Sequence, residues 1–137
     1  QGIDRAGCVS SFLMGHGTAA EYPIHPSSAL YPDKQPQAYS PDDFNTAIAA
    51  AGYGSDASPV SVTLLVNSES AHKRDAAAKI AAALSTSALQ VSIAAVPWSE
   101  FVARLKSGNF DLYYGEYKMT ADWDLTELLT GSCNYGR

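Results

Sequence analysis

Side chains suited to ligand binding gather in a polar stretch that follows the last predicted strand of the chain. Asp122 can pair with a ligand cation, Trp123 can stack against a solute, and Lys118 can recognise a carboxylate or another anion. Met119 in the same stretch and Tyr117, the last residue of the predicted strand, are further candidate contacts. The structural alternatives are a solvated loop position for Asp122 and a ring packed beneath the loop for Trp123. These residue types indicate reversible binding of a small solute.

Asp124 has a different predicted role. It directly precedes Leu125–Thr130, a segment that we predict as a short helix, and aspartate is a favourable N-cap residue. Together with Asp122 it forms a carboxylate pair of the kind used in acid–base chemistry, but both residues occupy a loop that leads into a helix cap. We therefore predict capping by Asp124 rather than catalysis.

Catalytic and metal-binding motifs find little support elsewhere in the chain. There is no G-x-S-x-G nucleophile elbow, and Gly15-His16-Gly17 lacks the third glycine and the preceding strand of a dinucleotide-binding loop. The histidines are scattered, without an HxxxH or HxH pattern, and lie at His16, His25 and His72. We therefore predict no enzyme activity, no cofactor and no metal site.

The composition is that of a folded globular domain. The 137 residues, 46% hydrophobic and 17% charged, fit one domain with one core. A net charge of −5 without a basic and aromatic cluster disfavours nucleic acid as a partner. No apolar run approaches the roughly 20 residues that span a bilayer. Cys8 and Cys133 lie near opposite ends of the chain, and either pair with each other or are two small buried thiols.

Helical periodicity predicts two helices in the N-terminal part of the chain. The first covers Gly2–Met14 and ends at the glycines that follow. Residues 18–39 are rich in proline, which predicts an extended segment that follows the surface. Ser40 is a suitable N-cap for the second helix, Pro41 suits its first position, and Gly52 ends it.

Residues 60–117 change to an alternating pattern of strands and helices. We predict strands at Val60–Val66, Leu89–Val96 and Phe110–Tyr117, separated by helices over about 69–85 and 98–107. Two such βαβ units predict an α/β fold with a largely parallel sheet and flanking helices. In open sheets of this kind, ligands meet the loops beyond the carboxyl ends of the strands. The polar stretch at 118–124 follows such an end, which is why we predict the binding site there.

Several short motifs follow one another in a fixed order along the chain. Ile3-Asp4-Arg5 with Gly15-His16-Gly17-Thr18-Ala19 resembles the "IDR…G.GTPA" segment of the family 5 extracellular solute-binding proteins. That family includes dipeptide-, oligopeptide- and nickel-binding members. Ser40-Pro41 through Gly52-Tyr53 resembles its "YDPEKAKALLAEAGY" helix, and Trp98-Ser99-Glu100-Phe101 with Leu105 to Asp111 resembles its "W.EY..RLK.G.FD" segment. The order of these pieces over nearly the whole chain carries the resemblance.

The resemblance implies a fold, a partner set and a location. It implies one lobe of a type II periplasmic-binding-protein-like fold, with residues 1–137 as a single domain and the second, C-terminal lobe of a larger two-lobe protein. Such a lobe binds peptides or a similar small solute and works with the other lobe and with the membrane permease of an ABC importer. The implied location is extracytoplasmic, periplasmic or at the cell surface, with a lipoprotein anchor on the full-length protein. The alternative is a sensory or chaperone-like module on the same fold.

One departure from the family pattern bears on the ligand. Peptide-binding members carry a "W..ADY.DP..FL" stretch whose first Asp holds the peptide's α-ammonium group. Aligning Asp124 with the second Asp of that stretch puts Ala121 at the ammonium-binding position. Asp122 replaces it only if the loop shifts by one residue. The resemblance therefore leaves two anchors open: the amino terminus of a peptide at Asp122, or an anionic group at Lys118.

Overall fold

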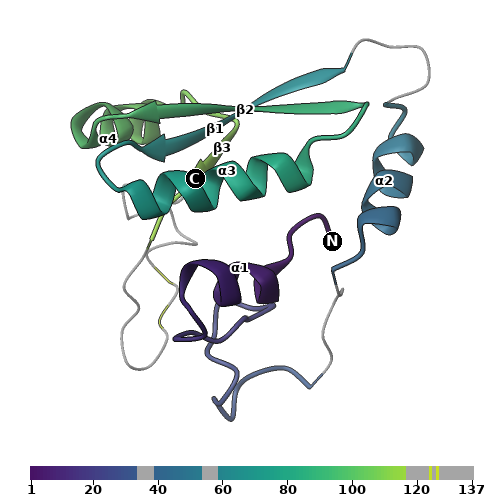
Figure 1. Cartoon of the computed structure of the whole chain (residues 1–137), viewed down its shortest axis with the longest axis vertical. Helices are drawn as coiled ribbons and strands as arrows, with labels where there is room; N and C mark the ends of the chain where they lie inside the picture. Colours follow the sequence, from purple (N-terminus) through teal and green to yellow (C-terminus); the bar gives the residue numbers. More distant parts are fainter. Residues whose placement is uncertain (34–38, 54–58, 117–123, 125, 127–137) are drawn as a thin grey trace. The chain divides into compact units, whose positions relative to one another are not determined.

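Strands and helices alternate in the computed structural model, which describes residues 1–33, 39–53, 59–116, 124 and 126. The alternation from residue 60 onward confirms the predicted α/β class. Among the described helices, none has the length and apolar character of a membrane-spanning segment. The elements in chain order are α1 (Arg5–Phe12), α2 (Pro41–Ala50), β1 (Val60–Asn67), α3 (Ala71–Leu84), β2 (Leu89–Val96), α4 (Trp98–Ser107) and β3 (Leu112–Tyr114) (Figure 1).

The three strands form one sheet in the order β2-β1-β3. β3 runs parallel to β1, with Leu64 opposite Leu112. On the other side of β1, the Val60 N–H donates to the Ala88 carbonyl (2.9 Å) and the Ser68 N–H donates to the Val96 carbonyl (2.8 Å). These hydrogen bonds join residues at the same sequence offset at both ends of the strand pair, so β2 is parallel as well. All three strands therefore end at one carboxyl edge.

β1 is the best buried element of the structure. Leu64, Leu65 and Val66 are consecutive and at most 3% exposed, as expected for a parallel strand that is covered on both faces. Leu65 packs with Phe101 and Leu105 of α4. The crossovers β1-α3-β2 and β2-α4-β3 run in opposite directions across the sheet. Since crossovers between parallel strands are right-handed in nearly all proteins, we expect α3 and α4 to cover opposite faces of the sheet. On α3, the small side chains of Ala76 and Ala77 are buried.

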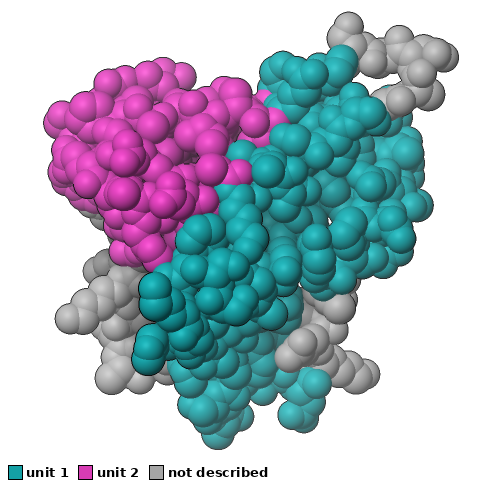
Figure 2. All heavy atoms as spheres, in the orientation of Figure 1, with its two compact units in different colours: residues 1–61, 79–90 teal, residues 62–78, 91–137 magenta. Residues whose placement is uncertain are grey.

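The chain divides into two compact units, coloured separately in Figure 2. Unit 1 consists of residues 1–61 and 79–90, and unit 2 consists of residues 62–78 and 91–137. Unit 1 therefore holds α1 and α2 with the last part of α3, while unit 2 holds α4, β3 and the carboxyl-terminal parts of β1 and β2.

That residues 1–137 form one lobe of a larger protein stays a prediction.

In unit 1, polar side chains connect α1 to its neighbours. Lys79 of α3 donates to the Ser11 hydroxyl (2.7 Å) and lies 5.4 Å above the centre of the Phe12 ring, a cation–π arrangement. Arg5 forms an ion pair with Glu21 (3.1 Å), and the Glu21 backbone N–H donates to the Tyr31 hydroxyl (2.9 Å). The Ile3-Asp4-Arg5 motif thus has a structural role. In the described part of the proline-rich segment, residues 18–33 contain neither helix nor strand.

Capping residues explain the helix ends that the sequence predicts well. The Ser40 hydroxyl caps α2 by accepting from the Asp43 backbone N–H (3.3 Å), and Pro41 occupies the first helical turn. Gly52 follows α2 with φ +88°, and Gly108 follows α4 with φ +70°. Glycine adopts this left-handed backbone at no steric cost, so each of these residues ends its helix where predicted.

Two predicted element boundaries are wrong. A helix over Gly2–Met14 is too long, because Asp4 caps a helix that begins only at Arg5. A strand over Phe110–Tyr117 begins too early, since β3 starts at Leu112. At the preceding position the Asp111 carboxylate accepts from the Thr63 backbone N–H (2.9 Å), so a side chain takes the place of a strand carbonyl there.

The cap of α1 couples Gly7 to Asp4. The Gly7 N–H donates to the Asp4 carboxylate (2.8 Å), and a Cβ atom at position 7 would collide with that same carboxylate. Alanine in place of glycine normally stabilises a helix by up to about 1 kcal/mol. Here we expect Gly7→Ala to lose that gain, because the Asp4 side chain must move away from the new Cβ and displacing an N-cap costs about 1 kcal/mol.

The coupling is measured by urea unfolding of four proteins: the parent, Gly7→Ala, Asp4→Ala and the double variant. With the cap already removed by Asp4→Ala, the same Gly7→Ala change should stabilise the protein, because only helix propensity remains. An equal effect of Gly7→Ala in both backgrounds would contradict the coupling.

Candidate functional site

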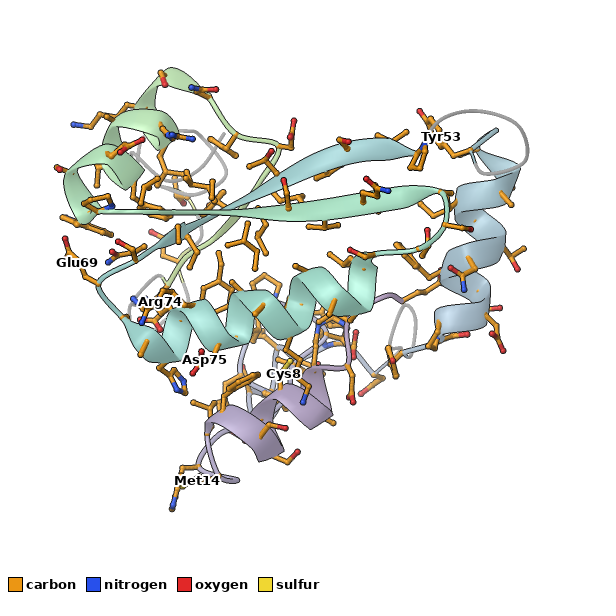
Figure 3. The ribbon with its side chains drawn as sticks, turned by 45° about the horizontal axis from the view of Figure 1, so that its top comes forward. Cys8, Met14, Tyr53, Glu69, Arg74 and Asp75 are labelled. Atoms are coloured by element: carbon orange, nitrogen blue, oxygen red, sulfur yellow. The ribbon has the colours of Figure 1, made fainter. Side chains whose placement is uncertain are left out.

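The carboxyl edge of the sheet brings together residues that follow different strands. After β1, the Asn67 side-chain oxygen accepts from the Glu69 backbone N–H (3.0 Å) and shapes the turn. The Glu69 carboxylate then accepts from the backbone N–H of Trp98 (3.1 Å), the first residue of α4. Figure 3 labels Glu69 in the turn beyond β1. The turn after β1 and the helix after β2 are therefore held together at this edge.

Glu69 satisfies a requirement that α4 does not meet by itself. Pro97 occupies the N-cap position of α4 and makes no side-chain cap hydrogen bond. The first N–H groups of a helix have no partner within the helix, and the positive end of the helix dipole attracts a carboxylate. Glu69 supplies both an acceptor and a negative charge at this point. We therefore interpret Glu69 first as a capping residue that positions Trp98.

Among the described residues, Trp98 is the most accessible aromatic group at this edge. Trp98 has 43% of its surface exposed. Its ring stacks on the Phe101 ring, with 5.6 Å between the ring centres and an interplanar angle of 19°. Phe101 is 2% exposed and belongs to the core. Trp98 and Phe101 are three residues apart and so share one apolar side of α4, yet only Phe101 is buried. The signal that distinguishes Trp98 is its position directly after the carboxyl end of β2.

An ion pair adds two charges at the same edge. Lys73, in the first turn of α3, lies 3.0 Å from the carboxylate of Glu116, two residues beyond β3. The Lys73 side chain is 24% exposed and that of Glu116 is 63% exposed. A pair this close to solvent contributes at most about 1 kcal/mol to stability. Its more relevant effect is to hold a cation and an anion near the edge where Trp98 lies.

The residues predicted as ligand contacts lie outside the described part of the structure. Glu116 and Asp124, on either side of them in the sequence, are described. The predicted contacts are Asp122, Trp123, Lys118, Met119 and Tyr117, and they stay predictions. Cys133 also lies outside the described residues, whereas Cys8 is half-buried and has a free thiol.

Asp124 makes the hydrogen bonds of a helix cap. Its carboxylate accepts from the Thr126 backbone N–H (2.8 Å) and from the Thr126 hydroxyl. These two hydrogen bonds, the one from the hydroxyl first, lower the pKa of the Asp124 carboxyl below its ordinary value. Apart from Thr126, the segment Leu125–Thr130 lies outside the described residues, so its helical character stays a prediction.

The other side chains that could take part in chemistry make structural contacts or lie apart from one another. Tyr113 packs against the core cluster of unit 2 and meets the Phe110 ring edge-on at 5.3 Å. The His25 ring contacts the Ser27 hydroxyl (2.7 Å). Within the described ranges, no three His, Cys, Asp or Glu side chains come together in a way that could hold a metal ion.

The arrangement at the carboxyl edge is suited to binding rather than to bond breaking. Trp98 offers an aromatic surface that is anchored from below by Phe101, and the Lys73–Glu116 pair offers one charge of each sign. An amphipathic solute can place an apolar part on the ring and a polar part on the charges. The fold and this edge together are suited to binding a small solute.

Comparison with known proteins identifies the family. The family described as "Bacterial extracellular solute-binding proteins, family 5 Middle" matches residues 1–133. The chain therefore belongs to the family 5 extracellular solute-binding proteins, which confirms the resemblance seen in its motifs. No curated protein gives a significant sequence match to the chain.

Solved structures share the fold of the chain over most of its length. The oligopeptide-binding protein AppA from Bacillus subtilis, in complex with a nonapeptide, is 23% identical with a TM-score of 0.75, over 93% of this chain and 28% of that protein. The Escherichia coli murein tripeptide binding protein MppA is 23% identical with a TM-score of 0.76, over 93% of this chain and 26% of that protein. NikA from Brucella suis, in complex with Fe(III)-EDTA, is 20% identical with a TM-score of 0.76, over 90% of this chain and 26% of that protein. The chain thus spans about a quarter of the length of these proteins.

The cap at Asp124 predicts a measurable titration. We expect the carboxyl of Asp124 to titrate below the ordinary aspartate value of about 3.9, and Thr126→Val to raise its pKa by removing the hydroxyl donor. Because the folded pKa is lower than the unfolded one, the cap favours folding above the unfolded pKa. That contribution disappears as the pH falls through the lowered folded pKa.

A ¹³C NMR titration of the aspartate carboxyl groups tests this expectation. The control is Thr46→Val. The Thr46 hydroxyl donates to the backbone carbonyl of Asp42 (2.8 Å) and not to a carboxylate. Thr46→Val should leave the Asp124 titration unchanged. An Asp124 pKa that does not respond to Thr126→Val would rule out the Thr126 hydroxyl as a cause of the shift.

Proposed function

We propose that this chain is the solute-binding lobe of a protein that delivers a peptide or a similar small solute to an ABC importer. The observation that carries the proposal is the family match over residues 1–133. The carboxyl edge agrees with it, because Trp98 and the Lys73–Glu116 pair lie where open α/β sheets bind ligands. No catalytic step is part of the proposal.

The proposed mechanism is reversible binding with closure of two lobes. The lobe described here supplies one wall, and a second lobe of the full-length protein supplies the other. Solute that contacts both walls favours the closed state by its higher affinity for that state. The closed protein then presents the solute to a membrane permease, and a separate ATPase supplies the energy for import.

The proposed contacts come from two segments at the same edge. Trp98 is the aromatic contact within the described residues. The stretch after Glu116 supplies the further contacts, which are Asp122, Trp123, Lys118, Met119 and Tyr117. This stretch follows the carboxyl end of β3, and Trp98 follows the carboxyl end of β2. Since parallel strands end at one edge of their sheet, Trp98 and Glu116 lie at that edge, and the other proposed contacts follow Glu116 in the sequence.

Peptides are the proposed class of solute. Two of the solved structures are an oligopeptide-binding and a murein tripeptide binding protein, while the third holds a metal chelate. A peptide has apolar side chains for Trp98 and terminal charges for Asp122 or Lys118. The family is described as extracellular, which agrees with a periplasmic or cell-surface location. A lipoprotein anchor on the full-length protein is part of the same proposal.

Ligand-dependent thermal stability of the full-length protein tests the proposed function. The panel is short peptides, free amino acids, sugars and Fe(III)-EDTA. A solute that binds only the folded state stabilises by about 2.7 kcal/mol at a hundredfold excess over Kd. We expect this increase with peptides. Trp98→Ala should weaken peptide binding roughly 5- to 30-fold, the range for loss of a contact worth about 1 to 2 kcal/mol.

Matched variants separate binding from folding. Tyr39→Ala removes another aromatic residue of similar exposure (47%) that lies outside the carboxyl edge, and it should leave peptide affinity unchanged. Asp122→Ala should abolish the response if the peptide amino terminus is anchored there. A response to Fe(III)-EDTA or a sugar but not to peptides would replace the peptide with that solute, provided that Trp98→Ala weakens the response. The absence of a response to every solute would refute the proposed binding role.

A further inference from the structure

Unit 1 contains a pocket that the proposed function does not use. Its volume is about 550 Å³, within the range of about 300–1,000 Å³ typical of small-molecule sites. It lies between the C-terminal half of α2 and the turn that joins α3 to β2. The residues that line it are Asn45, Ile48, Ala49, Tyr53, Ser85, Thr86, Ser87 and Ala88.

Hydrogen bonds hold the turn side of the pocket in one shape. The Thr86 hydroxyl accepts from the backbone N–H groups of Ala88 (3.2 Å) and Leu89 (3.1 Å). The Thr86 N–H donates to the Leu89 carbonyl (2.7 Å), and the Ser85 hydroxyl donates to the Ala81 carbonyl (2.8 Å). A wall that is already ordered loses little conformational entropy when a ligand binds.

The helix side of the pocket is held by the end of α2. Gly52 has φ +88°, its N–H donates to the Ala49 carbonyl (3.0 Å), and the Tyr53 N–H donates to the Ile48 carbonyl (3.3 Å). This pair of hydrogen bonds is a Schellman motif, which fixes the direction of the chain after the helix. It sets Tyr53, labelled in Figure 3, at the pocket with 47% of its surface exposed.

Among the described residues, the lining mixes polar and apolar groups and carries no charge. Within the described part of the chain, the Asn45 amide, the Tyr53 hydroxyl and the Ser87 hydroxyl make no hydrogen bond with another residue. These groups can both donate and accept. A phosphate or a free amino acid would find no opposite charge here, whereas a ligand rich in hydroxyl groups matches donors and acceptors together. The Tyr53 ring adds a flat apolar surface.

We propose that this pocket is a second ligand site, which binds a single uncharged sugar ring. Hydroxyl groups of the sugar bond to Asn45, Ser87 and the Tyr53 hydroxyl, while the apolar face of the sugar ring lies against Tyr53 and Ile48. The site is independent of the carboxyl edge, because its residues belong to α2 and to the segment that precedes β2. A free monosaccharide and a terminal sugar of a longer glycan share this chemistry.

The test is an NMR titration of the ¹⁵N-labelled full chain with glucose and with N-acetylglucosamine up to tens of millimolar. We expect saturable shifts of the backbone amides in 45–53 and 85–89, with a dissociation constant in the millimolar range because the site is open to solvent. A short oligosaccharide of the same sugar distinguishes a free monosaccharide from the terminal sugar of a glycan as the ligand. Tighter binding of the oligosaccharide would identify a glycan as the ligand, and equal binding would identify the free sugar. Sodium sulfate and glycine serve as charged probes and should cause no saturable shift there.

Variants on neighbouring positions of α2 make the test specific. Asn45→Ala and Tyr53→Ala should each weaken sugar binding at least fivefold. Thr46→Ala is the control, since Thr46 adjoins Asn45 but does not line the pocket, and it should keep the parent affinity. Amide spectra of all three variants establish that they are folded. Shifts that do not saturate, or that survive Asn45→Ala and Tyr53→Ala, would overturn the proposal, as would stronger binding of sulfate or glycine. Peptide binding to the full-length protein is a separate measurement and is unaffected by either outcome.

Discussion

Burial of β1 on both faces is the constraint on which the rest of unit 2 depends. A strand in the middle of a parallel sheet exposes apolar side chains in both directions, and each face must be covered by a crossover helix. Leu65 meets this requirement through Phe101 and Leu105 of α4. Because the same crossovers make all strands parallel, the carboxyl ends of the strands must share an edge. The location of the candidate site is therefore a consequence of how the core is buried.

At that edge, the groups that stabilise the fold also position the groups suited to binding. The Glu69 carboxylate satisfies the first N–H of α4 (3.1 Å) and so fixes the backbone of Trp98. Phe101 fixes the ring of Trp98 from the core side. An exposed tryptophan held at both its backbone and its ring has few conformations to lose when a ligand stacks on it. In this sense α4 is both a cover for β1 and the support of an aromatic contact.

The parts of the fold that could be predicted from the sequence are those with local signals. Ser40, Gly52 and Gly108 act through their own backbone or their nearest neighbours, so the ends of α2 and α4 were predictable. The contacts Glu69–Trp98 and Lys73–Glu116 join residues that are distant in sequence and follow only from the strand order, which no local pattern specifies. Helical spacing puts Trp98, Phe101 and Leu105 on one apolar side of α4, but only Phe101 and Leu105 are buried. Helical periodicity does not record which end of a helix lies at the sheet edge, so it could not separate Trp98 from the other two. The pocket of unit 1 was not predictable for a related reason, since α2 and the turn before β2 meet only in the folded chain.

The chain's size relative to its structural neighbours limits what one wall can do energetically. Ligand sites bury most of a small solute, whereas a flat edge leaves the other side of the solute in water. Stacking on Trp98 alone gains roughly 1 kcal/mol, much less than the cost of restraining a free molecule. Tight binding therefore requires a second surface that covers the solute and excludes water from the Lys73–Glu116 charges, where electrostatic interactions become stronger as the dielectric constant falls. The exposed Trp98 and the solvent-accessible ion pair therefore agree with the proposed closure, since each would gain most of its binding energy only when a second surface covers the solute.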